Sequence, residues 1–281
     1  MTRGAYRPFT EEERRRIGRF WVSVSAPWRR VVRPVFFGHE RVPCSGPAIW
    51  AGNHSLYAFA DASLMVSEIY ERHGIVLRSL GSHHHFRVAG WGDALTANGV
   101  VNGTRDNCAA MLRAGEHVLV YPGGGGEVFK RVGEKHRVRW KQRTGFARLA
   151  LEHACPIIPF ATVGADDCWD IVYDNDALGR TWLGQQLVQR LGVKAEELPT
   201  VISGLAGTPL PRPERMYFRF LPPVYPDAFR HLPIDEAAIA MRTHVEREVQ
   251  GAIDDLLAYR AQDAGRSLRA RLLSSLEQAA R

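Results

Sequence analysis

Residues 47–80 read PAIWAGNHSLYAFADASLMVSEIYERHGIVLRSL, and this stretch decides the fold. Short apolar runs at 47–52 and 75–80 predict two strands, and the apolar spacing at 61–72 predicts a helix between them. A strand, a helix and a second strand in this order are typical of domains built around a parallel sheet. The stretch therefore predicts an α/β fold.

The same alternation continues along the chain. Three further strands are predicted, at 117–121, 156–162 and 216–221. Three further helices are predicted: one from Thr104 through Leu112 with Gly115 as its C-terminal cap, one at 144–153, and a long amphipathic one that starts near Asp235. Residues 166–213 contain many turn residues and no clear period, so we expect loops and short helices there, over one end of the sheet. The pattern predicts a mostly parallel sheet flanked by helices.

An amphipathic helical segment is predicted before this alternation begins. Thr10 and Glu13 have the spacing of a capping box, and apolar residues follow at helical spacing: Ile17, Phe20, Trp21 and Val24. Pro27 is expected to bend or end this helix, and a second helix is expected over residues 28–37, where aromatic and aliphatic residues alternate with arginines. Such a composition suits the headgroup region of a membrane. The alternative is that both helices pack on the rest of the domain.

Composition and charge restrict the class of protein. A chain of 281 residues fits one large domain, and its formal net charge of +7 favours an anionic partner such as a lipid surface or a phosphorylated molecule. No zinc-ligand pairs and no aromatic RNA-binding pattern stand out, so nucleic acid is not an expected partner. No apolar run approaches the roughly 20 residues that span a bilayer, and no signal peptide is visible. We expect a cytoplasmic protein, peripherally associated with the cytoplasmic face of a membrane.

The cysteines do not suggest a disulfide framework or a structural metal site. The chain has four, at Cys44, Cys108, Cys155 and Cys168. They stand far apart, and no two of them form a Cys-x-x-Cys pair. The run His83-His84-His85 also invites a metal interpretation, but neighbouring side chains point in different directions and no carboxylate or cysteine is suitably spaced. No metal is predicted, and we expect a loop near the mouth of the functional site instead.

Four short blocks contain the residues suited to chemistry. His54 follows the strand at 47–52 and precedes a helix, which is where α/β folds place functional groups. Residues 99–105 read GVVNGTR, residues 121–127 read YPGGGGE, and residues 156–159 read PIIP.

In this order and spacing the four blocks resemble the glycerolipid acyltransferase superfamily, which includes the PlsC-type lysophosphatidate acyltransferases and a branch related to diacylglycerol acyltransferases. The resemblance covers about residues 30–225. It implies an acyltransferase domain at 38–262, preceded by membrane-contacting helices at 1–37 and followed by an Arg-rich helical tail at 263–281. The implied reaction moves a fatty acyl group from acyl-CoA, a co-substrate, to a hydroxyl of a lysophospholipid or other glycerolipid, and no further cofactor is expected.

His54 matches the histidine of the family's first block, which implies that it is the catalytic base. A neutral imidazole is suited to take a proton from an attacking alcohol. The family pattern places an aspartate after four intervening residues, but here Phe59 occupies that place and the first carboxylate is Asp61. On one continuous helix Asp61 would lie about 10 Å along the axis from His54, so it can orient the imidazole only if the loop folds back. The alternative role of Asp61 is capping of the helix that follows.

The second and third blocks supply the expected substrate contacts. Arg105 matches the basic residue of the second block and is predicted to bind a phosphate group, although it can equally be an ordinary surface arginine. Gly123, Gly124 and Glu127 match the third block. The glycine loop offers backbone N–H groups for a tetrahedral oxyanion. Glu127 is expected either to hold the acceptor hydroxyl or to organise the glycine loop.

Two questions stay open at this level. The cationic run at 130–143 can hold the phosphates of coenzyme A or a lipid headgroup, or it can be a solvated basic face. The displaced carboxylate also leaves a second hypothesis for the whole chain, a catalytically inactive protein with the same fold that binds lipid or a membrane.

Overall fold

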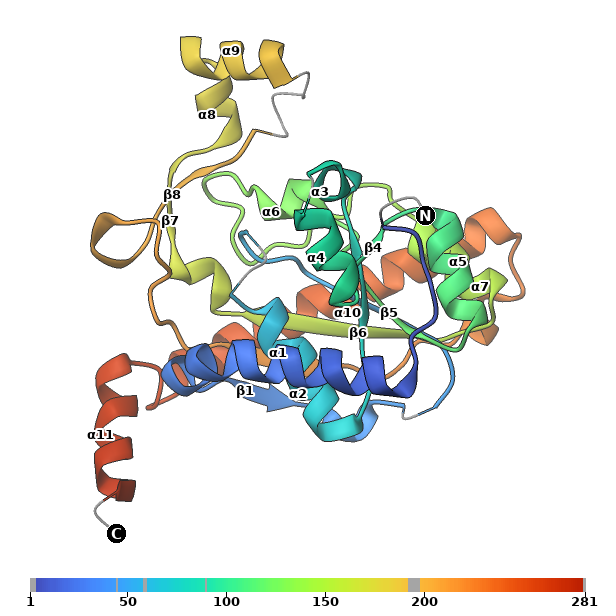
Figure 1. The fold of residues 1–281 in the computed structure, drawn as a ribbon, viewed down its shortest axis with the longest axis horizontal. Helices are drawn as coiled ribbons and strands as arrows, with labels where there is room; N and C mark the ends of the chain where they lie inside the picture. The colour runs from blue at the N-terminus through green and yellow to red at the C-terminus, as the bar shows by residue number, and fades with distance from the viewer. Residues whose placement is uncertain (1–3, 44, 58–59, 89, 192–197, 280–281) are drawn as a thin grey trace.

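A seven-stranded sheet lies at the centre of the molecule (Figure 1). The computed structural model describes residues 4–43, 45–57, 60–88, 90–191 and 198–279. In spatial order the strands are β1 (Val35–Phe37), β9 (Tyr217–Phe220), β6 (Ile157–Val163), β2 (Ala48–Gly52), β5 (His117–Val120), β3 (Arg78–Gly81) and β4 (Val101–Asn102). Every pair of neighbours is parallel except β6 and β9. The predicted α/β fold with a mostly parallel sheet is confirmed.

Helices cover both faces of the sheet. On one face lie α5 (Arg105–Arg113), α7 (Gly145–Glu152) and α10 (Ile234–Gln262), and on the other lie α1 (Glu11–Val32) and α2 (Ala62–His73) (Figure 1). Strand β2 is buried along its whole length because it contributes to both cores. Ile49 and Ala51 pack in the core beneath α10, while Ala48 and Trp50 pack in the core beneath α2. Helices α2, α5 and α7, the start of α10 and strands β2, β3, β5, β6 and β9 match the predicted elements within a few residues.

The N-terminal segment differs from its prediction. The capping box of Thr10 and Glu13 is present, but α1 continues through Pro27 to Val32, so one helix stands where two were expected. The helix ends at Arg33, which has left-handed backbone, and residues 35–37 then form β1, which pairs with β9. The prediction of a second helix is therefore wrong, because the aromatic residues there pair with a strand that lies far along the chain.

The region at 166–213 contains more structure than was predicted. Strands β7 (Asp170–Tyr173) and β8 (Val201–Ser203) form a separate antiparallel pair, and α8 (Asn175–Gly179) and α9 (Trp182–Leu191) follow β7. Figure 1 shows α8 and α9 projecting from the body, so they do not cover the end of the sheet as expected. The two strands are too short, and their pairing too irregular, to leave a clear pattern in the sequence.

Several short elements and one further helix complete the fold. They are α3 (His83–Arg87), α4 (Trp91–Ala97), α6 (Gly125–Val128), α11 (Leu268–Ala279) and the 3-10 helices η1 (His39–Arg41), η2 (Ala165–Cys168), η4 (Leu205–Gly207) and η5 (Pro226–Phe229). The three neighbouring histidines lie in α3, so the loop predicted for them is wrong. Within the described ranges no three side chains are arranged as a metal site. Among the same residues no helix has the length and apolar character needed to cross a bilayer.

Candidate active site

His54 lies at the carboxyl end of β2, beside the end of the parallel neighbour β5. The first residue after β5 is Tyr121, and its ring stacks on the imidazole of His54, with 3.9 Å between the ring centroids and 6° between the planes. Asn53 continues the pairing of β2 with β6, because its side chain exchanges hydrogen bonds of 2.9 and 2.8 Å with the backbone of Thr162. The end of the central strand β2 therefore holds His54 against Tyr121. This position, at the carboxyl ends of the parallel strands, is where α/β folds bind ligands.

The surroundings of His54 keep its imidazole neutral. Burial of the ring and, secondly, the positive charge of Lys130 lower the pKa of His54 to about 3, while the carboxylate of Asp166 opposes them. At neutral pH the ring therefore carries a free lone pair. Its Nδ1 atom is buried and has no hydrogen-bond partner in the described part of the chain.

Asp61 lies close by but does not pair with the imidazole. Its buried carboxylate accepts a hydrogen bond of 2.7 Å from the hydroxyl of Ser55, the residue next to His54. Burial raises the pKa of Asp61 to about 6. Asp61 occupies the N-cap position of α2, yet its side chain accepts no helix amide there, so the capping alternative is not what the structure has. Phe59, which stands in the family's aspartate position, lies outside the described residues, as does Cys44.

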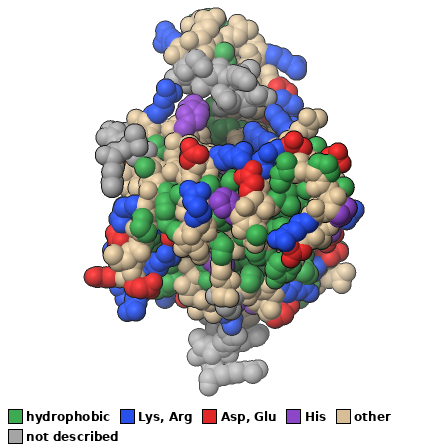
Figure 2. All heavy atoms as spheres, turned by 90° about the vertical axis from the view of Figure 1, so that its right-hand side faces the viewer, with side chains coloured by type: hydrophobic (Ala, Val, Ile, Leu, Met, Phe, Trp, Pro, Cys, Tyr) green, Lys and Arg blue, Asp and Glu red, His purple; other side chains and the backbone are tan. Residues whose placement is uncertain are grey.

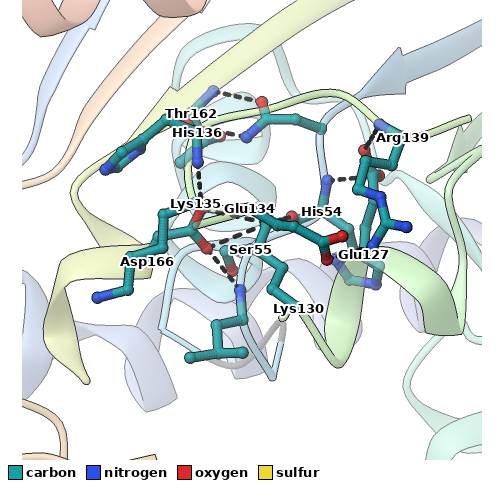
Figure 3. A network of polar contacts seen from close by, with 12 residues as sticks. His54, Ser55, Glu127, Lys130, Glu134, Lys135, His136, Arg139, Thr162 and Asp166 are labelled. Atoms are coloured by element: carbon teal, nitrogen blue, oxygen red, sulfur yellow. Dashed lines mark hydrogen bonds and ion pairs between the residues drawn. The ribbon is translucent and has the colours of Figure 1, made fainter. Parts of the chain in front are cut away.

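Glu127 organises the loops around His54. The residue is fully buried in the short helix α6. One carboxylate oxygen accepts the backbone N–H of His54 at 3.1 Å, and the other accepts the backbone N–H of Arg139 at 2.7 Å (Figure 3). Of the two roles expected for Glu127, this geometry matches the organisation of a loop, because both oxygens are occupied by protein.

The glycine loop is shaped by two side chains that press against it. A Cβ atom on Gly123 would lie 2.2 Å from the side chain of Glu127, and one on Gly124, where φ is +53°, would lie 2.5 Å from Arg143. Arg143 donates hydrogen bonds to the carbonyl oxygens of Pro122 and Gly123 at 3.0 and 2.9 Å. The first two glycines therefore have a packing role, and the backbone carbonyls of the loop are held by a guanidinium.

The next two glycines are different. A Cβ atom on Gly125 or Gly126 would meet nothing within 4 Å. Their amides belong to the first turn of α6, and within the described residues they donate to no acceptor. These two N–H groups are therefore available for an oxyanion.

This contrast predicts that the same substitution has a large effect on stability at Gly123 and a small one at Gly125. Gly123→Ala should lower the free energy of unfolding by about 1–3 kcal/mol, because Glu127 is held by two hydrogen bonds and cannot move aside. Gly125→Ala should change it by less than about 1 kcal/mol, since its Cβ faces open space. Urea denaturation of both variants measures the difference. Equal stabilities would contradict the packing role given to Gly123.

A pocket of about 420 Å³ adjoins this site. Its apolar walls include Tyr121, so the residue that stacks on His54 also borders the pocket; the other apolar lining residues are Leu80, Cys108, Val120, Pro122, Phe146 and Leu149. Arg105 and Arg143 supply the positive charge. On the side of the molecule seen in Figure 2, Lys and Arg side chains gather around a hollow with hydrophobic side chains inside it. An apolar pocket with cations suits a molecule that has both a hydrocarbon chain and an anionic group.

Arg105 lies where the second block predicts it, at the start of α5 and beside the pocket. Its side chain is 59% exposed and pairs with Glu152 at 2.5 Å. The guanidinium is therefore accessible to a phosphate, although it forms an ion pair with the carboxylate of Glu152.

Three contributors to the site, Tyr121, Lys130 and Asp166, were not singled out from the sequence. Tyr121 stood inside a quoted block without an assigned role. Lys130 belonged to the cationic run, but it is 1% exposed and pairs with Asp166 at 3.2 Å, so at this position the run is not a solvated face. Sequence spacing cannot show that Lys130 contacts Asp166, which lies 36 positions later. The apolar pair directly before Lys130 was, however, a sign in the sequence that this lysine is buried.

Similarity to known proteins extends over most of the chain. The family model described as Acyltransferase matches residues 33–163. The chain is 29% identical over 252 residues to Phytyl ester synthase 2, chloroplastic, from Arabidopsis thaliana, which covers 83% of this chain and 36% of that protein. It is 28% identical over 149 residues to the human DGAT1/2-independent enzyme synthesizing storage lipids, covering 53% of this chain and 44% of that protein. The chain thus spans less than half the length of these relatives.

A solved structure shares the fold. It is the crystal structure of the 1-acyl-sn-glycerophosphate (LPA) acyltransferase PlsC from Thermotoga maritima, with a TM-score of 0.53 and 14% sequence identity, over 87% of this chain and 80% of that one. The sequence blocks, the fold and these similarities agree. Residues 33–163 match the Acyltransferase family, and these relatives support the resemblance of the chain to the glycerolipid acyltransferase superfamily.

Proposed function

We propose that this protein transfers a fatty acyl group from acyl-CoA to a hydroxyl of a lysophospholipid or other glycerolipid, with His54 as general base. The observation that carries the proposal is the stacking of His54 on Tyr121, which in turn borders an apolar pocket of about 420 Å³. A neutral imidazole that is one residue away from a pocket for a hydrocarbon chain suits acyl transfer to an alcohol.

In the proposed reaction His54 takes the proton of the acceptor hydroxyl as its oxygen attacks the thioester carbonyl carbon. The amides of Gly125 and Gly126 stabilise the negative charge that develops on the carbonyl oxygen. The carbon–sulfur bond then breaks, and the imidazolium returns the proton to the departing thiolate. The products are the new ester and free coenzyme A, and the reaction needs no oxidant, reductant or further reactant.

Asp61 is the carboxylate proposed to support the imidazolium. Its pKa of about 6 leaves it ionised at neutral pH, and its bond to Ser55 holds it one residue from His54. A negative charge near the forming imidazolium lowers the free energy of that state, and the carboxylate of Asp166 acts on His54 in the same direction.

The N-terminal helix is proposed to bring the protein to a lipid surface. Trp21 and Trp28 pack against the domain, where their indoles donate to the carbonyl oxygens of Asn98 and Ala60. Phe20, Val24 and Val31 remain exposed on α1, between its arginines. We propose that this exposed face contacts an anionic membrane, which would supply the lipid substrates.

Arg105 provides a test of acceptor chemistry. Arg105→Ala should raise the KM for lysophosphatidate by about 10-fold or more, because a charge-assisted bond to the phosphate is lost, and should leave the KM for diacylglycerol within about 2-fold. Arg113→Ala, at the other end of α5, is the matched control. An equal change for both acceptors would show that Arg105 does not bind the acceptor's phosphate.

Acceptor-dependent release of the coenzyme A thiol tests the function as a whole. Purified protein would be incubated with palmitoyl-CoA and, in turn, with lysophosphatidate, diacylglycerol and phytol, the last because a similar protein is named a phytyl ester synthase. Thiol release that depends on a glycerolipid supports the proposal. Release that depends only on phytol would replace the proposed acceptor class by an isoprenoid alcohol.

A further inference from the structure

A buried ion pair lies directly behind the peptide group of His54. Lys130 follows α6 and Asp166 lies in η2; their side chains are 1% and 4% exposed and 3.2 Å apart. The ammonium group of Lys130 also donates a hydrogen bond to the carbonyl oxygen of His54 (Figure 3). Since Glu127 accepts the N–H of the same residue, both backbone polar groups of His54 are held by buried charged side chains.

Asp166 fixes the continuation of the same loop. Its carboxylate accepts the backbone N–H of Leu56 at 2.7 Å and that of His136 at 3.0 Å. One residue further, Tyr57 has a φ of 58°, a left-handed conformation that is strained for a non-glycine residue. Its N–H donates to the carbonyl oxygen of Val128 at 3.1 Å. The loop after His54 is thus held in a strained shape by the chain segment after the glycine loop and by η2.

Stability alone is a weak explanation for this pair. Removing the charges of a lysine and an aspartate from water is unfavourable, and apolar replacements of buried pairs are often neutral or stabilising. A buried pair that bonds to the backbone next to a catalytic group has a second use, because it fixes the position of that group to within a fraction of an ångström.

We propose that Lys130, held in place by Asp166, is a positioning residue for the acyl transfer, which fixes the peptide of His54 and so aims its imidazole at the acceptor hydroxyl. The inference rests on the proposed function and assigns a role to two side chains that the reaction itself does not use. Lys130 also acts through its charge, because its ammonium disfavours the protonated imidazole and thereby helps to lower the pKa of His54. The other ionisable groups around His54 are Asp166, Glu127, Tyr121 and Asp61, which is reached through Ser55.

Three variants of the full chain separate position, charge and folding. Lys130→Met removes the charge and keeps most of the stem, and Lys130→Arg keeps the charge. Lys135→Met is the matched control, because Lys135 lies in the same segment and also donates to a backbone carbonyl, that of Trp169, but does not touch His54. For each variant, kcat and KM would be measured, and the Cε1–Hε1 NMR signal of His54, assigned with His54→Gln, would be titrated.

Lys130→Met should lower kcat by about 10²-fold with the KM for acyl-CoA nearly unchanged, because misplacement of a catalytic group affects the chemical step. Its His54 signal should titrate at a pH higher by about one unit or more, since a like charge has been removed. Lys130→Arg should recover most of the rate, and Lys135→Met should match the wild type. A Lys130→Met protein with normal kcat, or with an unmoved His54 titration, would overturn the proposal even if its stability fell.

A second variant keeps the test decisive if Lys130→Met does not fold. Asp166→Asn preserves the shape of the side chain and leaves the lysine charge unopposed, so the pKa of His54 should fall. Its NMR signal should titrate at lower pH, or show only the neutral imidazole at every pH at which the protein is folded. An upward shift would overturn the proposal. The NMR titration needs no turnover, so it tests the effect of Lys130 on His54 independently of the proposed reaction. If the wild type forms no ester while the titrations shift as expected, only the proposed function is refuted.

Discussion

His54→Ala should lower kcat for acyl transfer by about 10²–10⁴-fold, the range in which a general base contributes. The loss is expected because no second imidazole lies against Tyr121 in the described structure, and the flanking carboxylates are engaged by Ser55 and by backbone amides. The KM for acyl-CoA should change little, since the pocket walls are unaltered. Initial rates measured with saturating donor and acceptor give both quantities.

The fold of this variant should be preserved. The side chain of His54 makes a stacking contact, and both hydrogen bonds of the residue come from its backbone, which alanine retains. The melting temperature should therefore fall by only a few degrees. His84→Ala, an exposed histidine of α3, is the control and should behave as wild type. Full activity of His54→Ala would eliminate the base mechanism.

Glu127→Ala should cause the second large effect, a loss of about 2–5 kcal/mol in the free energy of unfolding together with a fall in kcat. The substitution leaves the buried N–H groups of His54 and Arg139 without their acceptor and opens a cavity beside Gly123. Because one of those N–H groups belongs to His54, the base loses its position as the fold weakens. Chemical denaturation and initial rates on the same preparation measure both effects.

Glu127→Gln refines this result. Glutamine keeps the volume but has one acceptor oxygen, so only one of the two N–H groups can be satisfied and an intermediate stability is expected. Glu12→Ala, an exposed glutamate in the first turn of α1, serves as the surface control. If Glu127 instead held the acceptor, Glu127→Ala would raise the KM for the acceptor at unchanged stability, and that outcome would refute the loop-organising role.

The parts of the fold that were predicted correctly are those encoded by local patterns. Strand β2 and helix α2 follow from short-range apolar spacing, and the capping box of α1 follows from two residues three positions apart. Strand β1 was missed because three residues carry no period, and its extended conformation depends on pairing with β9, about 180 positions later. The small β7–β8 pair escaped prediction for the same reason.

The residues of the site divide in the same way, into those that stand in local sequence blocks and those that only the fold brings together. His54, the glycine loop and Arg105 belong to contiguous blocks, so their neighbourhood was predictable from order and spacing. Asp61 was identified as the nearest carboxylate, but a sequence does not show that it bonds to Ser55. Lys130 and Asp166 could not be paired from the sequence, because their contact depends on how the loop after α6 packs against η2.

Mass spectrometry of the lipids formed from isotope-labelled palmitoyl-CoA tests directly whether the protein transfers an acyl group to a glycerolipid. Purified protein would be incubated with the labelled donor, anionic vesicles and a panel of lysophospholipid and diacylglycerol acceptors. We expect a labelled ester on at least one glycerolipid hydroxyl with the wild-type protein, and none with His54→Ala. If the wild-type protein binds the vesicles but forms no labelled ester with any acceptor, the protein binds lipid and is not an acyltransferase.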